Sequence, residues 1–210
     1  MKNVMVGIPV IYCEECVKLC LESLREQDSH VFIVDNDSTS EIKKMIESYP
    51  KLVNDRNLYV NPAWNQIMKY FLDSNYEKLI ILNSDMILNN DVIEKISAIN
   101  IDEDLSIILP NVSDHDMNEG TLEIEWGYPG IMIVLTQKMA KLVYPIPESL
   151  KIWFGDDWIY RRLIKNGYKL RIYYDIKAHH SGSRSIVSLK EASEIIEQDK
   201  LNWIVEEKKI

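Results

Sequence analysis

Short apolar runs and amphipathic stretches alternate along most of the chain. Four runs rich in Val, Ile and Leu predict strands at residues 4–8, 31–34, 79–82 and 105–109. Runs of this length without polar alternation are typical of strands that are covered on both faces by helices, as in a parallel sheet. The pattern therefore favours a central sheet built mainly from parallel strands.

Helical spacing of apolar residues fills most of the intervals between these runs. It predicts helices at 14–25, 40–49, 62–72, 91–99, 136–143 and 157–165, and further strands at 57–60, 121–126, 130–135 and 169–174. A Ser-Leu-Lys-Glu capping box at Ser188 opens a carboxyl-terminal helix that runs to about residue 206. Alternating strands and helices predict an α/β fold, Rossmann-like, with a mostly parallel central sheet flanked by helices. We expect one domain that spans residues 1–210.

Composition and charge exclude several classes of protein. Apolar residues make up 46% of the 210 positions and charged residues 27%, which is ordinary for a globular chain. The net charge of −9 argues against general nucleic-acid binding, which needs clustered Lys and Arg. No apolar run approaches the roughly 18 residues that a membrane-spanning helix needs. The amino terminus lacks the cleavage site of a signal peptide, so we expect a soluble, cytoplasmic protein.

Three cysteines, Cys13, Cys16 and Cys20, lie within eight residues. A zinc or redox pair at Cys13 and Cys16 is the alternative reading, but the chain has no second pair and no nearby His that would complete four ligands. Cys20 lies on the apolar face of a predicted helix. We expect reduced thiols, and the odd count fits a reducing compartment.

The segment KLIILNSDMIL, residues 78–88, joins an apolar run to a polar end. The run stops at Asn83, Ser84 and Asp85, and ligands bind at the carboxyl ends of strands in open α/β sheets. A carboxylate with an amide oxygen two residues earlier suits a hard divalent cation. In isolation, however, Asn-Ser-Asp is also a common turn sequence.

Other polar clusters occupy equivalent places along the chain. They are Tyr12, the sequence DNDS at 35–38, the sequence GDD at 155–157 and the sequence HHSGS at 179–183. If the strands are parallel and adjacent, all of these clusters meet Asp85 at one edge of the sheet. That convergence, rather than any single cluster, points to an active site.

Two of these clusters carry groups suited to acid–base or metal chemistry. Asp156 and Asp157 could simply cap a helix, but the flanking aromatics in WFGDDW imply partial burial. Burial raises a carboxylate pKa and makes a general base usable near neutral pH. A His pair in a loop is often structural, yet His179 or His180 could join Asp85 in a site for Mn²⁺, whereas Mg²⁺ prefers oxygen ligands.

Six segments, in this order, resemble the GT-A glycosyltransferases of family 2. They are VGIPVIYCEECVKLCLESL, VFIVDNDSTS, VNPAWNQIMKY, KLIILNSDMIL, FGDDWIYRRLIKNGYKL and KAHHSGSRS, and together they cover roughly residues 4–185. The resemblance implies a GT-A fold and a nucleotide-sugar-dependent hexosyltransferase that inverts the sugar carbon. It also implies a Mn²⁺ or Mg²⁺ ion and a donor linked to UDP or GDP.

The resemblance also assigns roles to individual residues. Those that would bind the nucleotide are Pro9, Tyr12, Asp35, Asn36, Ser38, Asn65, Asn83, Ser84 and Asp85. Asn83 and Asp85 occupy the outer positions of the DXD motif, and Asp85 would hold the metal with His179 or His180. Gly130 would lie where the acceptor approaches the backbone. Asp157 would be the catalytic base, with Asp156 as a neighbour that could exchange roles with it.

Departures from the family pattern keep two alternatives open. Asn83 stands where the family has Asp, and Asn61-Pro62 replaces the usual Asn-x-Gly. A non-catalytic nucleotide or sugar binder on the same fold therefore remains an alternative. A sugar-phosphate nucleotidyltransferase is the other, although the first strand offers only Gly7 where that class has a Gly-rich loop. The acceptor, whether glycan, protein or another hydroxyl compound, is left open.

Overall fold

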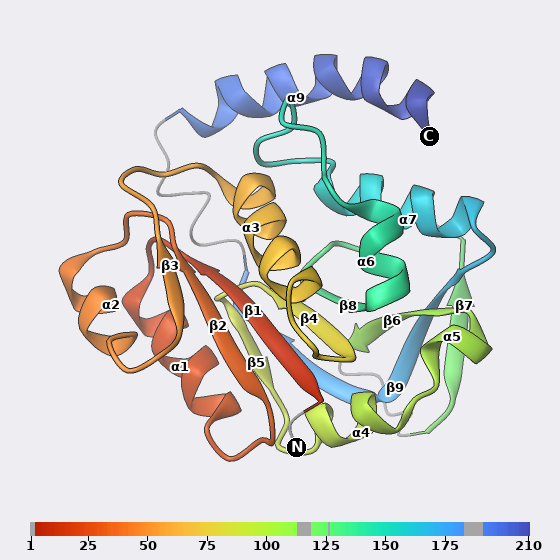
Figure 1. Ribbon diagram of the computed structural model, residues 1–210, viewed down its shortest axis with the longest axis horizontal. Helices are drawn as coiled ribbons and strands as arrows, with labels where there is room; N and C mark the ends of the chain where they lie inside the picture. Colours follow the sequence, from red (N-terminus) through yellow and green to blue (C-terminus); the bar gives the residue numbers. More distant parts are fainter. Residues whose placement is uncertain (1–2, 113–118, 126, 183–190) are drawn as a thin grey trace.

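A five-stranded sheet lies at the centre of the protein (Figure 1). The computed structural model describes residues 3–112, 119–125, 127–182 and 191–210. The strand order is β3-β2-β1-β4-β8, with bounds β1 Val4–Val10, β2 His30–Asp35, β3 Lys51–Val53, β4 Lys78–Leu82 and β8 Met132–Thr136. The first four strands are parallel, and β8 pairs antiparallel with β4 at one edge. The prediction of a mostly parallel sheet flanked by helices is confirmed.

A second sheet forms around the long strand β9 (Lys169–His180), with the order β5-β9-β6. Strand β6 (Ser106–Asn111) runs parallel to β9, whereas β5 (Met86–Leu88) and β7 (Thr121–Ile124) run antiparallel to it. The pairing of β5 with β9 brings the far end of β9 beside the turn that follows β4. The second sheet therefore brings a late segment of the chain to the edge of the first.

The helices follow the strands in the order expected from the apolar pattern. Their bounds are α1 Glu14–Leu24, α2 Ser40–Met45, α3 Val60–Leu72, α4 Val92–Ala98, α5 Ile101–Asp104, α6 Gln137–Val143, α7 Gly155–Lys165 and α9 Ala192–Glu206, followed by the 3-10 turn η1 Glu207–Lys209. In Figure 1, α3 crosses the front of the central sheet and α9 lies along the top of the molecule. In the described part of the chain, no helix is long and apolar enough to cross a membrane.

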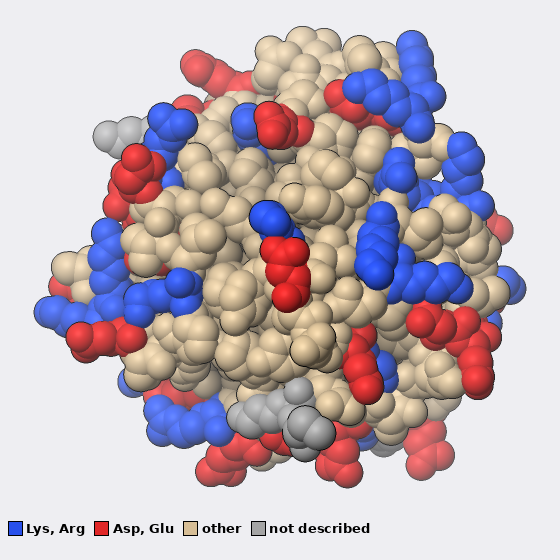
Figure 2. Space-filling model, in the orientation of Figure 1, with Lys and Arg blue, Asp and Glu red and all other residues tan. Residues whose placement is uncertain are grey.

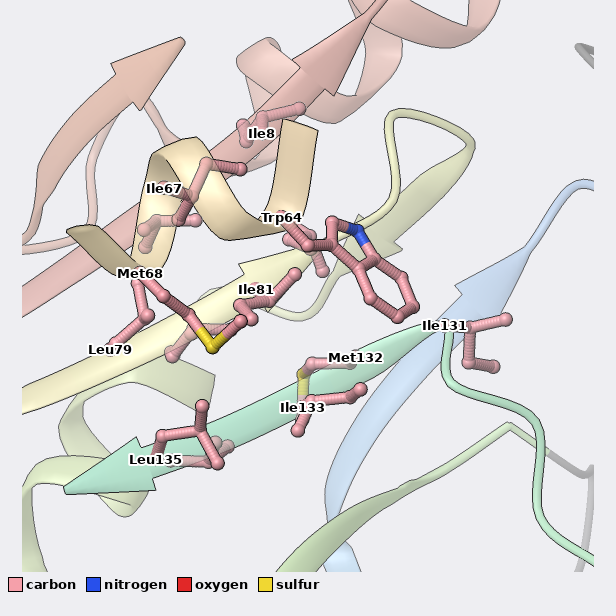
Figure 3. Close-up of a cluster of buried hydrophobic side chains, with 14 of the residues drawn as sticks. Ile8, Trp64, Ile67, Met68, Leu79, Ile81, Ile131, Met132, Ile133 and Leu135 are labelled. Atoms are coloured by element: carbon pink, nitrogen blue, oxygen red, sulfur yellow. The ribbon is translucent and has the colours of Figure 1, made fainter. Parts of the chain in front are cut away.

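One part of the hydrophobic core lies between α3 and the central sheet. Figure 3 shows Ile67 and Met68 of α3 facing the side chains of Ile8, Leu79 and Ile81 on strands β1 and β4, and all five side chains are buried. The contact is close at Gly7 of β1, where an added Cβ would lie 2.1 Å from Cγ2 of Ile67. Glycine at this position therefore lets the helix pack on the sheet.

Some predicted boundaries differ from those of the structure. The strand expected at 57–60 is wrong, because the third strand is β3 and Val60 already belongs to α3. The Asn36 side chain explains the difference: its Oδ1 accepts from the Leu58 N–H at 3.0 Å, and its Nδ2 donates to the Tyr59 carbonyl at 3.2 Å. These bonds occupy backbone groups that a strand would need. The helix expected at 40–49 ends at Met45, and the strand expected at 169–174 continues to residue 180.

The amino-terminal cysteines also differ from expectation. Cys13 has a left-handed backbone (φ 65°), which turns the chain so that its Cα lies 5.3 Å from that of Cys16, and the two form a disulfide. The expectation of reduced thiols is wrong for this pair. Cys20 is free and buried. The capping box predicted at 188–191 lies mostly outside the described residues.

Candidate active site

A cavity of about 370 Å³ opens at the carboxyl edge of β1 and β4. Its lining includes most of the site residues that the sequence singles out, namely Pro9, Tyr12, Asn36, Asn83, Ser84, Asp85, Gly130, Asp156, Asp157 and His180. These residues come from strands β1 and β9, from helix α7, and from the segments that follow β1, β2 and β4 or precede β8. The predicted convergence of distant polar clusters at one edge of the sheet is therefore what the structure shows.

Asp85 and His180 form a contact pair in this cavity. Oδ2 of Asp85 lies 3.2 Å from Nε2 of His180, and the two side chains are 8% and 23% exposed. The β5–β9 register produces the contact, because Met86 pairs with His180 and the Ser181 N–H donates to the Asp85 carbonyl at 3.0 Å. Side chains alternate along a strand, so the neighbouring His179 is exposed and does not line the cavity.

The Asp85–His180 pair fits a divalent cation in its chemistry. A carboxylate oxygen and an imidazole nitrogen suit Mn²⁺, and both side chains reach the cavity. The described residues contain no group of three or more His, Cys, Asp or Glu side chains that could hold a metal. Asp85 and His180 are thus a pair of side chains of the types that bind divalent cations, without a third such side chain beside them in the described part of the chain.

Asp156 is held by backbone N–H groups at the start of α7. Its Oδ2 accepts from the Gly130 N–H at 2.8 Å, and its Oδ1 accepts from the Asp157 N–H at 3.0 Å. A Cβ at Gly130 would lie 2.4 Å from the Cβ of Asp156, so only glycine allows this approach. Burial raises the pKa of Asp156 above its usual value, and the two N–H donors oppose the rise. Oδ2 of this carboxylate therefore joins α7 to the segment that leads into β8, while Oδ1 bonds within the first turn of α7.

Asp157 is the next residue, and its environment differs. Burial, and then the charge of Asp156, raises the pKa of Asp157 to about 6, while Arg161 opposes the shift. Within the described residues, the Asp157 side chain makes no hydrogen bond, although it lines the cavity. A partly buried carboxylate with a free acceptor and a pKa near neutrality can take a proton from a bound hydroxyl group.

The loop just before α7 is fixed by a residue that sequence reasoning missed. Asp199 of α9 is fully buried, and its carboxylate accepts from three successive N–H groups, those of Lys151 (2.9 Å), Ile152 (2.7 Å) and Trp153 (2.9 Å). From the other side, Nδ2 of Asn61 donates to the Trp153 carbonyl at 2.9 Å. The available signal was an acidic residue among inward-facing positions of the predicted carboxyl-terminal helix, four residues before Trp203.

Four predicted site residues do not line the cavity. Asp35 is buried, and its Oδ1 accepts from the Ser38 N–H at 2.8 Å, which closes the turn after β2. Asn65 exchanges two hydrogen bonds of 2.8 Å with the backbone of Ile146 and so fastens the segment after α6. Ser38, whose N–H bonds Asp35, and His179 complete the four. Asn36 does reach the cavity, but its amide group is bonded to the 54–59 segment.

Comparison with known proteins gives a consistent result. Residues 5–166 match the model of the family described as glycosyl transferase family 2. The fold is similar to that of TarS from S. aureus (TM-score 0.67, 18% identity, 87% of this chain and 37% of that chain). It is also similar to the mannosyltransferase PcManGT from Pyrobaculum calidifontis, solved with GDP-Man and Mn²⁺ (TM-score 0.69, 12% identity, 96% and 64% coverage). A search of curated proteins found no significant match.

A shorter form of TarS, solved in complex with UDP, gives a TM-score of 0.67 at 19% identity over 85% of this chain and 59% of that chain. At these identities the likeness establishes the fold, which is that of the GT-A glycosyltransferases. The present chain spans between 37% and 64% of the length of these three structures.

Proposed function

Because the chain belongs to glycosyl transferase family 2, we propose that it moves a sugar from a nucleoside-diphosphate sugar to an acceptor hydroxyl group. One observation carries the proposal: Asp157, with its raised pKa, and the Asp85–His180 pair line the same cavity. A base and a pair of metal-binding side chains are what a direct displacement at a sugar carbon requires on the protein side.

The donor nucleotide occupies the part of the cavity beside β1. Pro9 and Tyr12 border it there, and Tyr12 offers a ring face to a base. UDP and GDP donors are the two candidates, because similar folds have been solved with UDP-GlcNAc and with GDP-Man. The Asn36 side chain bonds the 54–59 segment, so it holds this side of the cavity in shape and does not bond the donor directly.

Asp85 and His180 are the residues that hold Mn²⁺ in this proposal, and Mg²⁺ is disfavoured by the imidazole ligand. A bound divalent ion stabilises the negative charge that builds on a departing diphosphate. Asn83, two residues before Asp85, places an amide group rather than a second carboxylate at this part of the cavity. The local negative charge is therefore lower than with two acids, and the affinity for the free ion should be modest.

Asp157 accepts the proton of the acceptor hydroxyl as its oxygen forms a bond to the anomeric carbon. The bond from that carbon to the diphosphate breaks in the same step, so the sugar carbon inverts. Asp156 does not exchange roles with Asp157 in this scheme, because both of its oxygens accept backbone N–H groups. Its charge instead helps to raise the pKa of Asp157.

Donor hydrolysis and nucleotide binding together test this function. A panel of UDP- and GDP-sugars is incubated with Mn²⁺ and with the parent protein, Asp157→Asn, Asp85→Ala and the control Asp73→Asn. Asp73 is an exposed carboxylate paired with Lys69 and does not line the cavity. We expect Asp157→Asn to bind nucleotide but to lose at least about 100-fold in turnover, in line with the loss of a general base. Asp85→Ala should weaken Mn²⁺-dependent binding.

The outcomes separate the alternatives. Equal turnover in the parent and Asp157→Asn would remove Asp157 as the base. Nucleotide binding without hydrolysis or transfer by the parent, for any acceptor, would favour the non-catalytic binder. Production of a nucleotide sugar from a sugar phosphate and a nucleoside triphosphate would favour the nucleotidyltransferase. Proton NMR of the transferred sugar reports whether the anomeric carbon inverts.

A further inference from the structure

The Cys13–Cys16 disulfide lies at the start of α1, next to the cavity, and has no part in the proposed reaction. Cys13 directly precedes the first residue of the helix, and Cys16 lies in its first turn. Cys13 is partly exposed, whereas Cys16 is buried. A Cys-x-x-Cys pair at a helix N-terminus is typical of redox-active sites, because this end of a helix stabilises the thiolate that disulfide exchange requires.

Tyr12, the residue before Cys13, lines the part of the cavity beside β1. Strand β1 ends at Val10 and α1 begins at Glu14, so Tyr12 lies in a three-residue bend between them. Both ends of the bend are fixed. The Val10 carbonyl accepts a backbone N–H from the turn after β2 at 2.9 Å, and the Glu14 carboxylate accepts from the hydroxyl group at the N-cap of α2 at 2.8 Å. Within the described residues, the backbone of Ile11 and Tyr12 makes no hydrogen bond to another backbone group.

The disulfide is the bond that fixes the shape of this bend. Cys13 has φ 65° and ψ 73°, a left-handed conformation that is unfavourable for residues other than glycine. The bond to Cys16 holds Cys13 in this conformation, with the two Cα atoms 5.3 Å apart. When the bond is broken, the Cys13 backbone can relax to negative φ, and Tyr12 moves with it. The Val17 N–H still donates to the Cys13 carbonyl, so the start of the helix stays in place.

Nucleotide affinity in this protein depends on short-range contacts such as the one that Tyr12 offers. The net charge is −9, and acidic and basic side chains are mixed on the face shown in Figure 2, so long-range attraction of a diphosphate is weak. A base gains affinity by stacking on an aromatic ring. A ring that is already held in place binds the base without the entropy cost of being ordered at that moment.

We propose that the Cys13–Cys16 pair is a redox switch for donor binding. The disulfide form holds Tyr12 in place for the nucleotide base, and the dithiol form binds the nucleotide more weakly. This inference rests on the proposed function, because the nucleotide-sugar donor supplies the base that Tyr12 contacts. It assigns a role to the two cysteines that neither the base Asp157 nor the metal-binding pair requires.

The reductant is a dithiol. Its thiolate attacks Sγ of Cys13, the more exposed sulfur, and the electron pair of the broken S–S bond moves to Sγ of Cys16, which takes up a proton. The second thiol of the reductant loses its proton and attacks the mixed disulfide. Cys13 then leaves as a thiolate and is protonated, and the reductant departs as a disulfide. Two electrons and two protons therefore pass from the dithiol to the cysteine pair.

Calorimetric titration of the oxidised and the reduced protein with UDP and with GDP tests the switch. Alkylation of free thiols followed by mass spectrometry establishes the state of the pair in each sample. We expect the affinity for the better-bound nucleotide to fall about tenfold on reduction, because the bend must then be ordered on binding. Cys13→Ser/Cys16→Ser should bind as weakly as the reduced parent and should not respond to a dithiol. Cys20→Ala is the matched control, because it removes the buried free thiol and should keep the full response.

Tyr12→Ala locates the effect in the ring. This variant should bind nucleotide weakly in both redox states, and a response that persists in it would overturn the role of Tyr12. Equal affinity in the oxidised and reduced parent, or tighter binding by the reduced form, also overturns the proposal. So does a parent in which Cys13 and Cys16 both remain open to alkylation after treatment with an oxidised dithiol.

NMR relaxation of the protein without nucleotide separates the failure of this proposal from the failure of the proposed function. We expect the backbone order parameters of residues 11–13 to fall from about 0.85 in the disulfide form to below about 0.6 in the dithiol form, while those of β1 stay unchanged. If neither form binds nucleotide, the proposed function fails, and a fall in these order parameters still supports redox control of the Tyr12 bend. Equal order parameters in the two forms overturn that control whether or not nucleotide binds.

Discussion

The acid limb of the pH–activity profile should report the ionisation of Asp157. Its pKa is raised to about 6, first by burial and then by the charge of Asp156. A general base must be ionised, so activity is present above this pKa and is lost below it. The ionised fraction falls from about nine-tenths at pH 7 to about one-tenth at pH 5, which predicts an approximately tenfold loss. A carboxylate with its usual pKa of about 3.9 would remain almost fully ionised over that interval.

Two substitutions should move this limb in opposite directions. Asp156→Asn removes a neighbouring negative charge, so the pKa of Asp157 and the limb should fall. Arg161→Gln removes the cation that opposes the shift, so the limb should rise. The measurement is kcat/KM for donor hydrolysis from pH 4.5 to 8 at saturating Mn²⁺, because this parameter reports groups of the free enzyme.

Opposite shifts tie the acid limb to Asp157, because Asp156 and Arg161 are the two charged groups that act on the pKa of this carboxylate in opposite directions. A limb that stays in place in both variants would refute Asp157 as its source. Full activity at pH 5 would refute the raised pKa itself.

Three further predictions concern stability and geometry. Folding raises the pKa of Asp157, so the contribution of this group to stability is fully present below about pH 4 and is lost as the pH rises through about 6. Asp157→Asn should therefore raise the free energy of unfolding by about 1 kcal/mol at pH 8, after allowance for solvent screening. The same substitution should leave it unchanged at about pH 3.5, and urea denaturation at the two pH values measures both. Asp199→Ala leaves three backbone N–H groups without their acceptor and should lower the free energy of unfolding by about 3 kcal/mol in the same assay. A decrease of less than about 0.5 kcal/mol would contradict a stabilising role for these buried hydrogen bonds. Gly130→Ala forces Asp156 away from a Cβ at 2.4 Å and should lower kcat about 100-fold with the fold retained by circular dichroism, since small displacements of a reacting group have effects of this size.

The fold could be predicted where local pattern and topology agree. Buried parallel strands have short apolar runs, and their polar ends must meet at one edge of the sheet. That reasoning was sufficient to bring Tyr12, Asp85 and Asp157 into one site. It failed at 57–60, where the side chain of Asn36, more than twenty residues earlier, takes the backbone hydrogen bonds. The local sequence gives no signal that a side chain from a distant part of the chain will bond these backbone groups.

The choice between adjacent residues also lay beyond the sequence. His179 and His180 have the same chemistry, and only the β5–β9 register decides that His180 faces Asp85. A shift of that register by one residue would exchange the two side chains between the faces of the strand. Register depends on the continuation of β9 past residue 174, where Ile176 and Ala178 are buried and alternate with polar residues, a short period-two pattern that the prediction did not use.

The wall of the cavity next to Asp157 depends on a helix outside the region that matches the family. The match ends at residue 166, whereas Asp199 lies on α9 and binds the backbone of 151–153. That loop leads directly into α7, so its position sets how Trp153 and Asp157 stand relative to each other at the cavity. The backbone that forms this wall is therefore held by a helix outside the matched region. The shape of the cavity beside Asp157 depends on α9 and its contacts as well as on the segments that carry the family resemblance.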